Sequence, residues 1–174
     1  MNKIVFVTGG AKSGKSDFTQ KYAESMEGYR LYIATAIPFD DEMEEKIKKH
    51  KEKRENLWHG LIEEPYNLHK SVLRLNPEPN VVLIDCITLW LNNLLLKYEN
   101  NVKKIYNCID ELSDNIRQVR YNLFIVSNEV GMGIVPENRL SRLFRDISGY
   151  ANQKIASVSN EFYVTFSGYN LRLK

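Results

Sequence analysis

One stretch decides the fold: Gly9-Gly10-Ala11-Lys12-Ser13-Gly14-Lys15-Ser16. It matches the G-x-x-x-x-G-K-[ST] pattern of phosphate-binding loops, lying between an apolar run, Lys3–Thr8, and a helical pattern, Ser16–Met26. A loop in that position can curl its backbone N–H groups around phosphate oxygens, and the dipole of the following helix favours the same anion. The stretch therefore predicts a nucleoside triphosphate site. Lys15 would contact the β- and γ-phosphates, and the Ser16 hydroxyl would coordinate Mg²⁺.

Further apolar runs alternate with helical patterns along the chain. The runs are nearly continuous in Val, Ile, Leu or Phe, which suits strands buried on both faces of a parallel sheet. The alternation predicts an α/β fold with a mainly parallel central sheet flanked by helices, and 174 residues fit a single domain spanning 1–174. The other expected strands are Arg30–Thr35, Val81–Asp85, Leu123–Ser127 and Phe162–Phe166, and the other expected helices are Asp41–Asn56, a stripe from Ile105 to Val119, and Asn138–Ala156.

Composition and charge give no indication of a nucleic-acid-binding, membrane-spanning or secreted protein. The 24 Lys and Arg residues nearly balance 22 Asp and Glu residues, a net charge of +2 that does not indicate a nucleic-acid partner. The longest apolar run, Cys86–Leu96, contains two asparagines and is too short to span a bilayer, and the N-terminus has no signal-peptide pattern. We expect a cytoplasmic protein in which Cys86 and Cys108 are buried thiols.

Asp85 is the acidic residue best placed to complete the site. It ends the buried run Val81–Asp85, and ligands of doubly wound sheets collect at the carboxyl ends of the strands. Asp85 would hold the metal together with Ser16, directly or through water. The alternative is an ordinary strand-end or helix-capping aspartate.

A histidine lies in a segment that is otherwise almost all charged. Met43, Ile47, His50 and Arg54 are spaced by 4, 3 and 4 residues, so a helix would place them on one face. His50 could be a structural histidine facing the core, or it could face solvent. It could also be a nucleophile, because a neutral imidazole can attack phosphorus, with Arg54 neutralising phosphate charge.

The segment after the fourth expected strand is the last candidate. Asn128–Pro136 contains two glycines and a proline, follows the carboxyl end of a strand, and should lie near the phosphate loop. Its apolar content favours a substrate-facing segment, but an ordinary surface loop stays open.

Together these motifs resemble one family over essentially the whole chain, that of bifunctional adenosylcobinamide kinase / adenosylcobinamide-phosphate guanylyltransferases. The most distinctive stretch runs from Asn128 to Arg139, whereas the phosphate loop alone is shared by many families. The other matching segments are Thr8–Ser16, Tyr32–Thr35, Asp40–Met43, His50-Lys51-x-x-Arg54, Phe144–Ile147 and Asn152-Gln153.

The resemblance implies a RecA-like P-loop fold, a homotrimer and two reactions in cobalamin biosynthesis. ATP or GTP phosphorylates adenosylcobinamide; then a histidine takes GMP from GTP and passes it to adenosylcobinamide phosphate, with pyrophosphate leaving. By position in the motif, that histidine is His50. The implied nucleotide contacts are Gly9, Gly10, Ala11, Lys12, Ser13, Gly14, Lys15, Ser16, Ala34, Thr35, Ala36, Lys51, Glu52, Lys53, Arg54, Glu63 and Asp85.

The sequence departs from the family pattern at three places. Ala36 stands where relatives often have Ser, and Lys49 stands where some have a second histidine. The segment between Arg54 and Glu63 is one residue longer, which leaves Glu63 or Glu64 as the contact. Two other functions remain open: a single-activity P-loop kinase in which His50 is structural, and a non-catalytic nucleotide-dependent switch.

Overall fold

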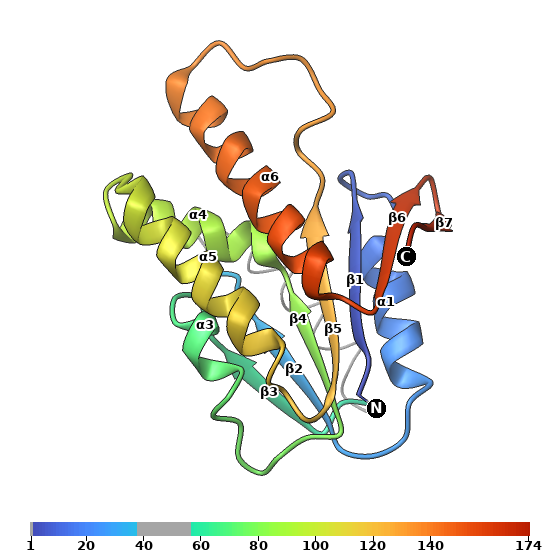
Figure 1. The fold of residues 1–174 in the computed structure, drawn as a ribbon. Coiled ribbons are helices and arrows are strands. Elements are labelled where there is room, and N and C mark those ends of the chain that lie inside the picture. The colour runs from blue at the N-terminus through green and yellow to red at the C-terminus, as the bar shows by residue number, and fades with distance from the viewer. Residues whose placement is uncertain (1, 38–56) are drawn as a thin grey trace.

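A computed structural model describes residues 2–37 and 57–174, in which one seven-stranded sheet organises the chain (Figure 1). The strand order is β3-β2-β4-β5-β1-β6-β7. All neighbours are parallel except β6 and β7, which form an antiparallel hairpin. The strands are β1 (Ile4–Gly9), β2 (Arg30–Ala34), β3 (Gly60–Glu63), β4 (Val81–Asp85), β5 (Asn122–Asn128), β6 (Glu161–Phe166) and β7 (Tyr169–Arg172).

Helices cover both faces of this sheet. Helix α1 packs against β1, β4 and β5 on one face, while the other described helices lie together on the opposite face (Figure 1). The helices are α1 (Lys15–Glu24), α3 (Leu68–Ser71), α4 (Ile87–Lys97), α5 (Val102–Ile116) and α6 (Arg139–Val158). The predicted α/β class with a mainly parallel, helix-flanked sheet is confirmed. None of the described helices is long and apolar enough to cross a membrane.

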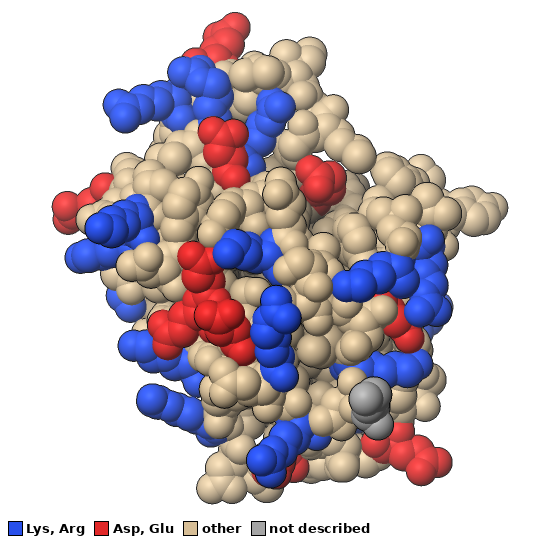
Figure 2. Space-filling view, in the orientation of Figure 1, with Lys and Arg blue, Asp and Glu red and all other residues tan. Residues whose placement is uncertain are grey.

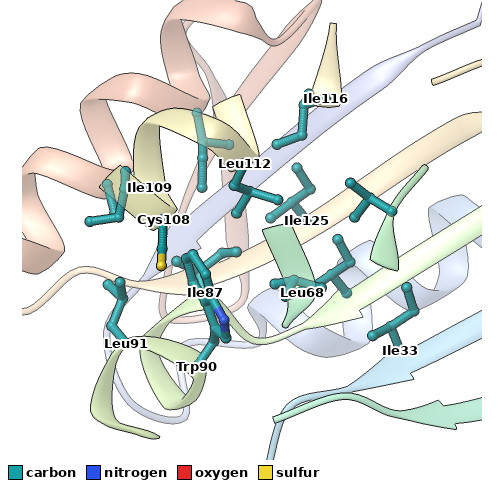
Figure 3. Packing of buried hydrophobic residues seen from close by; sticks show 14 of the residues in the cluster. Ile33, Leu68, Ile87, Trp90, Leu91, Cys108, Ile109, Leu112, Ile116 and Ile125 are labelled. Atoms are coloured by element: carbon teal, nitrogen blue, oxygen red, sulfur yellow. The ribbon is translucent and has the colours of Figure 1, made fainter. Parts of the chain in front are cut away.

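Alternation along the strands divides the core into two layers. Phe6 faces the layer beneath α4, α5 and α6, whereas its neighbours Val5 and Val7 face α1. In the larger layer, Trp90 packs among aliphatic side chains from the sheet and from α5 (Figure 3). Both faces of the central strands are therefore buried, which explains their continuous apolar runs.

The five expected strands are present, but four elements were missed. β3 and β7 have four residues each and are largely half-buried or exposed, so neither has a distinctive apolar run. α3 is a single turn. The apolar run Cys86–Leu96, which the sequence showed to be too short to span a bilayer, largely forms α4. This helix is apolar on most sides because it is buried. The whole of the expected helix Asp41–Asn56 lies outside the described residues.

A buried carboxylate stabilises the α1 side of the sheet. Glu161 is 6% exposed and accepts hydrogen bonds from Tyr22 and Tyr163, both at 2.9 Å. Lys3 Nζ lies 3.1 Å from its other oxygen. Burial opposes ionisation, but these donors lower the pKa of Glu161 below its usual value. The ionised carboxylate therefore contributes to folding near neutral pH.

Candidate functional site

The phosphate loop leaves β1 at Gly9 and enters α1 at Lys15. Gly14, the residue before the helix, has φ 94°, a left-handed conformation that favours glycine. Gly9 is constrained by space instead: a Cβ there would lie 2.6 Å from both Ser13 Oγ and the carbonyl oxygen of Thr165. Each glycine thus has its own physical reason to be glycine.

The loop is held from outside by the β6–β7 hairpin. The N–H of Gly168, in the hairpin turn, donates to the carbonyl of Ser13 at 2.8 Å. On the other side, the N–H of Glu129 donates to the carbonyl of Gly9 at 3.0 Å. The loop backbone is therefore fixed between the hairpin and the segment that follows β5, which preorganises it for an anion.

Two loop side chains are buried where phosphates would bind. Lys15 is 9% exposed, and its Nζ donates to the carbonyl of Gly10 at 3.2 Å, so the ammonium lies folded over the loop. The Ser13 hydroxyl is buried and has no hydrogen-bond partner within residues 2–37 and 57–174. An unpaired buried hydroxyl costs about 1–3 kcal/mol, which a phosphate oxygen could offset. Ser16 is half-buried in the first turn of α1.

Asp85 lies at the same edge of the sheet, at the end of β4. One strand, β5, separates β4 from β1, so the acidic strand is the second neighbour of the loop strand. The Tyr32 hydroxyl donates to Asp85 Oδ2 at 2.8 Å. Tyr32 is 4% exposed, and its ring meets Trp58 edge-on at 5.4 Å between centroids. Tyr32 thus orients Asp85, a role that sequence reasoning missed because the two are 53 residues apart.

Ser16 and Asp85 fit the oxygen chemistry of Mg²⁺. Tyr32 engages only one carboxylate oxygen of Asp85, and the other receives no hydrogen bond from the described part of the chain. No cluster of three or more His, Cys, Asp or Glu side chains that could enclose a metal occurs among the described residues. A serine hydroxyl and a carboxylate are oxygen ligands of the kind that Mg²⁺ takes, and phosphates and water usually complete its shell.

The segment Ala34-Thr35-Ala36 follows β2 beside Asp85. Ala34 pairs with Asp85 on one side and with Glu63 on the other. The Thr35 hydroxyl is fully buried; it accepts from the N–H of Cys86 at 2.9 Å and donates to its carbonyl at 2.7 Å. Thr35 therefore joins β2 to the end of β4, and its hydroxyl could donate to a phosphate oxygen only if its bond to the Cys86 carbonyl broke.

Glu63 and Glu64 have different settings in the structure. Glu64 accepts hydrogen bonds from the Ser71 hydroxyl at 2.7 Å and from the N–H groups of Asn67 and Tyr66 at 2.7 and 3.2 Å. Partial burial opposes ionisation, but these donors lower the pKa of Glu64. Its carboxylate is thus engaged at the start of α3, whereas Glu63 ends β3 in line with Ala34. Ala34 in turn pairs with Asp85, so Glu63 lies in register with the acidic residue that ends β4.

His50, Lys51, Glu52, Lys53 and Arg54 lie outside the described residues, but the other two histidines have structural settings. His59 precedes β3, at the opposite edge of the sheet, and its Nδ1 accepts from the N–H of Arg30 at 3.0 Å. His69 is 4% exposed, and burial lowers its pKa although Glu111 lies 3.7 Å away. Neither imidazole faces the phosphate loop.

The two cysteines are buried free thiols, as expected. Burial, with Asp85 nearby, raises the pKa of Cys86 to about 12, so the thiolate nucleophile is not available at neutral pH. Burial also raises the pKa of Cys108. Cys86 contributes two backbone contacts to Thr35.

The segment after β5 projects beyond the sheet and leads into α6 (Figure 1). Its tip is apolar and exposed: Met132 is 76% exposed and Ile134 is 97% exposed. Figure 2 shows an uncharged surface over part of the projecting top of the molecule, with Lys, Arg, Asp and Glu beside it and over the rest of the visible face. The Asn138 side chain caps α6 by accepting from the N–H of Ser141 at 2.7 Å. The segment thus starts beside the phosphate loop and ends at a defined helix N-terminus.

Comparisons with known proteins identify the family of the chain. Residues 5–173 match the family model of cobinamide kinase / cobinamide phosphate guanyltransferase. The chain is 36% identical to the bifunctional adenosylcobalamin biosynthesis protein CobU of Escherichia coli K12 and 37% identical to that of Salmonella typhimurium LT2. Each alignment covers 98% of this chain and 99% of the relative. The bifunctional adenosylcobalamin biosynthesis protein CobP of Pseudomonas aeruginosa is 35% identical over 97% of this chain and 95% of its own length. The chain therefore belongs to the cobinamide kinase / cobinamide phosphate guanyltransferase family.

Proposed function

We propose that the chain carries out both reactions of its family at one triphosphate site. ATP or GTP phosphorylates adenosylcobinamide, and GTP then supplies GMP to adenosylcobinamide phosphate, giving adenosylcobinamide-GDP and pyrophosphate. The observation that carries this proposal is the phosphate loop itself, fixed from both sides and backed by the buried Lys15 at the edge where Asp85 ends β4. The near full-length similarity to bifunctional relatives supports the pairing of the two activities.

In the kinase reaction the acceptor hydroxyl oxygen attacks the γ-phosphorus. A new P–O bond forms, the bond to the β-phosphate oxygen breaks, and the nucleoside diphosphate leaves while the hydroxyl proton passes to solvent or to a base. Lys15 would move from the Gly10 carbonyl onto the β- and γ-phosphates. Ser16 and Asp85 would hold Mg²⁺, which when bound neutralises phosphate charge.

In the guanylyl reaction a nitrogen of His50 attacks the α-phosphorus of GTP. A P–N bond forms, the α–β P–O bond breaks, and pyrophosphate leaves. A phosphate oxygen of adenosylcobinamide phosphate then attacks the same phosphorus, and the P–N bond breaks to regenerate the imidazole. The settings of His59 and His69 favour His50 by elimination, because each of the other two is engaged away from the loop.

We assign the remaining nucleotide contacts by position. Glu63 and the Ala34–Ala36 segment line the sheet edge next to Asp85 and could meet the nucleoside. Lys51, Glu52, Lys53 and Arg54 follow the nucleophile in sequence, and their cationic members would neutralise phosphate charge during transfer.

Covalent labelling tests this function. Incubation with α-labelled GTP and Mg²⁺ should label the protein through an acid-labile, base-stable bond, and peptide mapping should locate the label at His50. His50→Ala should remain unlabelled. A wild-type protein that never takes up label would exclude the guanylyltransferase activity and leave a single-activity kinase. Equal labelling of His50→Ala would place the nucleophile elsewhere.

A second variant tests whether one loop serves both reactions. Lys15→Ala should strongly impair phosphoryl transfer and self-guanylylation together, because both would use the same lysine. Unchanged kinase turnover in this variant would require a separate kinase nucleotide site.

We further propose a cytoplasmic homotrimer. Apolar side chains are exposed along the β7 hairpin, where Phe166 is 50%, Tyr169 83% and Leu171 56% exposed. β7 is also the outer strand of the sheet, and such a surface is usually covered by a partner. Sedimentation equilibrium should give three times the chain mass of 20.3 kDa. A monomer at micromolar concentration would contradict the trimer without affecting the enzymatic proposal.

A further inference from the structure

Buried polar atoms without partners gather at the junction of β5 and α6. Four of the seven such side-chain atoms in the described part of the chain belong to Asn128, Arg145, Ser148 and Asn152, which we call the β5–α6 cluster. The unpartnered atoms are Asn128 Oδ1, Arg145 Nη1, Ser148 Oγ and Asn152 Oδ1. Ser148 is 1% exposed and Asn152 is 8% exposed. Each such atom costs about 1–3 kcal/mol when left unpaired, so their concentration indicates a site completed by a ligand.

The cluster adjoins the phosphate loop. Asn128 is the last residue of β5 and pairs in register with Gly9, where the loop begins. Asn152 Nδ2 donates to the carbonyl of Asn128 at 3.3 Å and so connects α6 to this edge of the sheet. A molecule bound in the cluster would therefore lie beside a triphosphate on the loop.

Helical spacing extends the cluster away from the sheet. Arg145, Ser148 and Asn152 are separated by 3 and 4 residues, which places them on one face of α6. The seven residues from Arg145 to Asn152 span about 10 Å of helix axis. The face thus runs from the loop edge toward the projecting segment that precedes α6 (Figure 1).

The chemistry of the cluster indicates the kind of ligand. No carboxylate in the described part of the chain forms an ion pair with Arg145, and a guanidinium with a buried unpaired N–H favours an anion, phosphate above all. The two amide oxygens require hydrogen-bond donors, such as hydroxyl or amide N–H groups. A phosphate monoester attached to an amide-bearing molecule would satisfy both requirements.

We propose that the β5–α6 cluster binds the acceptor substrate, with Arg145 holding the phosphate of the phosphorylated acceptor and Ser148 and Asn152 positioning its neutral part. This proposal rests on the proposed function, because it assumes a phosphorylated corrinoid acceptor. In this proposal Arg145 distinguishes adenosylcobinamide phosphate from adenosylcobinamide. Its contact with the phosphate matters for guanylyl transfer and less for the kinase reaction.

The test compares acceptor binding with formation of the guanylylated intermediate, which needs no acceptor. Arg145→Ala should weaken binding of cobinamide phosphate by about tenfold or more, the equivalent of one hydrogen bond to a charged group. It should leave binding of unphosphorylated cobinamide within about threefold and self-guanylylation at the wild-type rate. Arg145→Lys should restore part of the affinity, since it keeps the charge but not the fork. Isothermal titration calorimetry gives both affinities, and thermal unfolding checks that each variant is folded.

Arg117→Ala is the matched control, because Arg117 is exposed at the C-terminal end of α5, far along the chain from the phosphate loop and its edge of the sheet. Ser148→Ala removes a hydroxyl that forms no hydrogen bond with the residues that the structure describes, so the variant should fold normally and weaken binding of both acceptors. If the wild type is labelled by GTP and binds cobinamide phosphate, but Arg145→Ala and Ser148→Ala bind both acceptors as the wild type does, the cluster holds only structural water and the proposal is wrong. If the wild type neither takes up label nor binds either acceptor, the proposed function itself fails.

Discussion

Tyr32→Phe tests the contact that orients Asp85. The substitution removes a hydroxyl that lies 2.8 Å from Asp85 Oδ2 and keeps the ring that packs edge-on against Trp58. Tyr32 is 4% exposed, so the ring stays in place and water does not readily replace the lost donor. The variant therefore changes the carboxylate orientation with little change in packing.

The magnitude follows from the hydrogen bond that is lost. A hydrogen bond to a charged group contributes about 1.5–3 kcal/mol, and the half-buried Asp85 favours the lower end of that range. A loss of about 1.5 kcal/mol, if expressed in the transition state, lowers kcat/KM by about tenfold. Both the kinase and the guanylyl reaction should be affected, since both are proposed to use the Asp85 metal site. The Mg²⁺ concentration for half-maximal rate should rise as well.

Steady-state assays over a range of Mg²⁺ concentrations provide the measurement, and Tyr163→Phe provides the control. Tyr163 also donates to a carboxylate, Glu161, at 2.9 Å, but at the α1 side of the sheet. Loss of this hydrogen bond should lower the free energy of unfolding by a similar amount, about 1.5 kcal/mol or a few degrees in Tm, and leave kcat/KM unchanged. If Tyr32→Phe and Tyr163→Phe lose equal stability and both keep wild-type kcat/KM and Mg²⁺ dependence, then Tyr32 has no role in orienting Asp85.

Three further predictions follow from the same contacts. Gly9→Ala should weaken GTP binding by more than about tenfold, because its Cβ would lie 2.6 Å from two oxygens, whereas Gly10→Ala meets no atom within 4 Å in the protein; equal affinities by calorimetry would contradict this. Glu161→Gln should cost about 2 kcal/mol at pH 7. The folded-state pKa of Glu161 is lowered, so its stabilisation is present above the ordinary value of 4.5 and disappears as pH falls further. Denaturant unfolding should show the two proteins converging in acid, and a pH-independent gap would refute the linkage. Glu64→Gln should lower Tm more than nucleotide affinity, whereas Glu63→Gln should do the reverse; the opposite pattern would make Glu64 the contact.

The phosphate loop and the central strands could be predicted from the sequence because each depends on local chemistry. The Gly9–Ser16 pattern requires a strand before it and a helix after it, and both are present. Strands buried on both faces leave continuous apolar runs, which is why β4 was found with its correct bounds, Val81–Asp85. Two elements could not be predicted because they lack such a pattern. The half-exposed β3 has no continuous apolar run, and the buried α4 has no polar face to mark a helical period.

Only part of the site could be predicted from the sequence. Asp85 could be placed at a strand end, but not its contact with Tyr32, since pairing between distant segments depends on strand order. Glu63 and Glu64 are adjacent in sequence and equivalent in type. The hydrogen bonds that Glu64 accepts at the start of α3 are visible only in the tertiary structure.

The sequence by itself determined that this protein has a phosphate loop in an α/β fold and that its motifs match one enzyme family, because backbone constraints on glycine and the periodicity of burial are local properties. The tertiary structure decided what surrounds that loop. Strand order brings Asn128 beside Gly9, the hairpin turn at Gly168 fixes Ser13, and α6 adds buried polar atoms that have no partners within the described chain. The first two of these contacts join residues more than 100 positions apart, and their geometry depends on how the whole sheet is assembled.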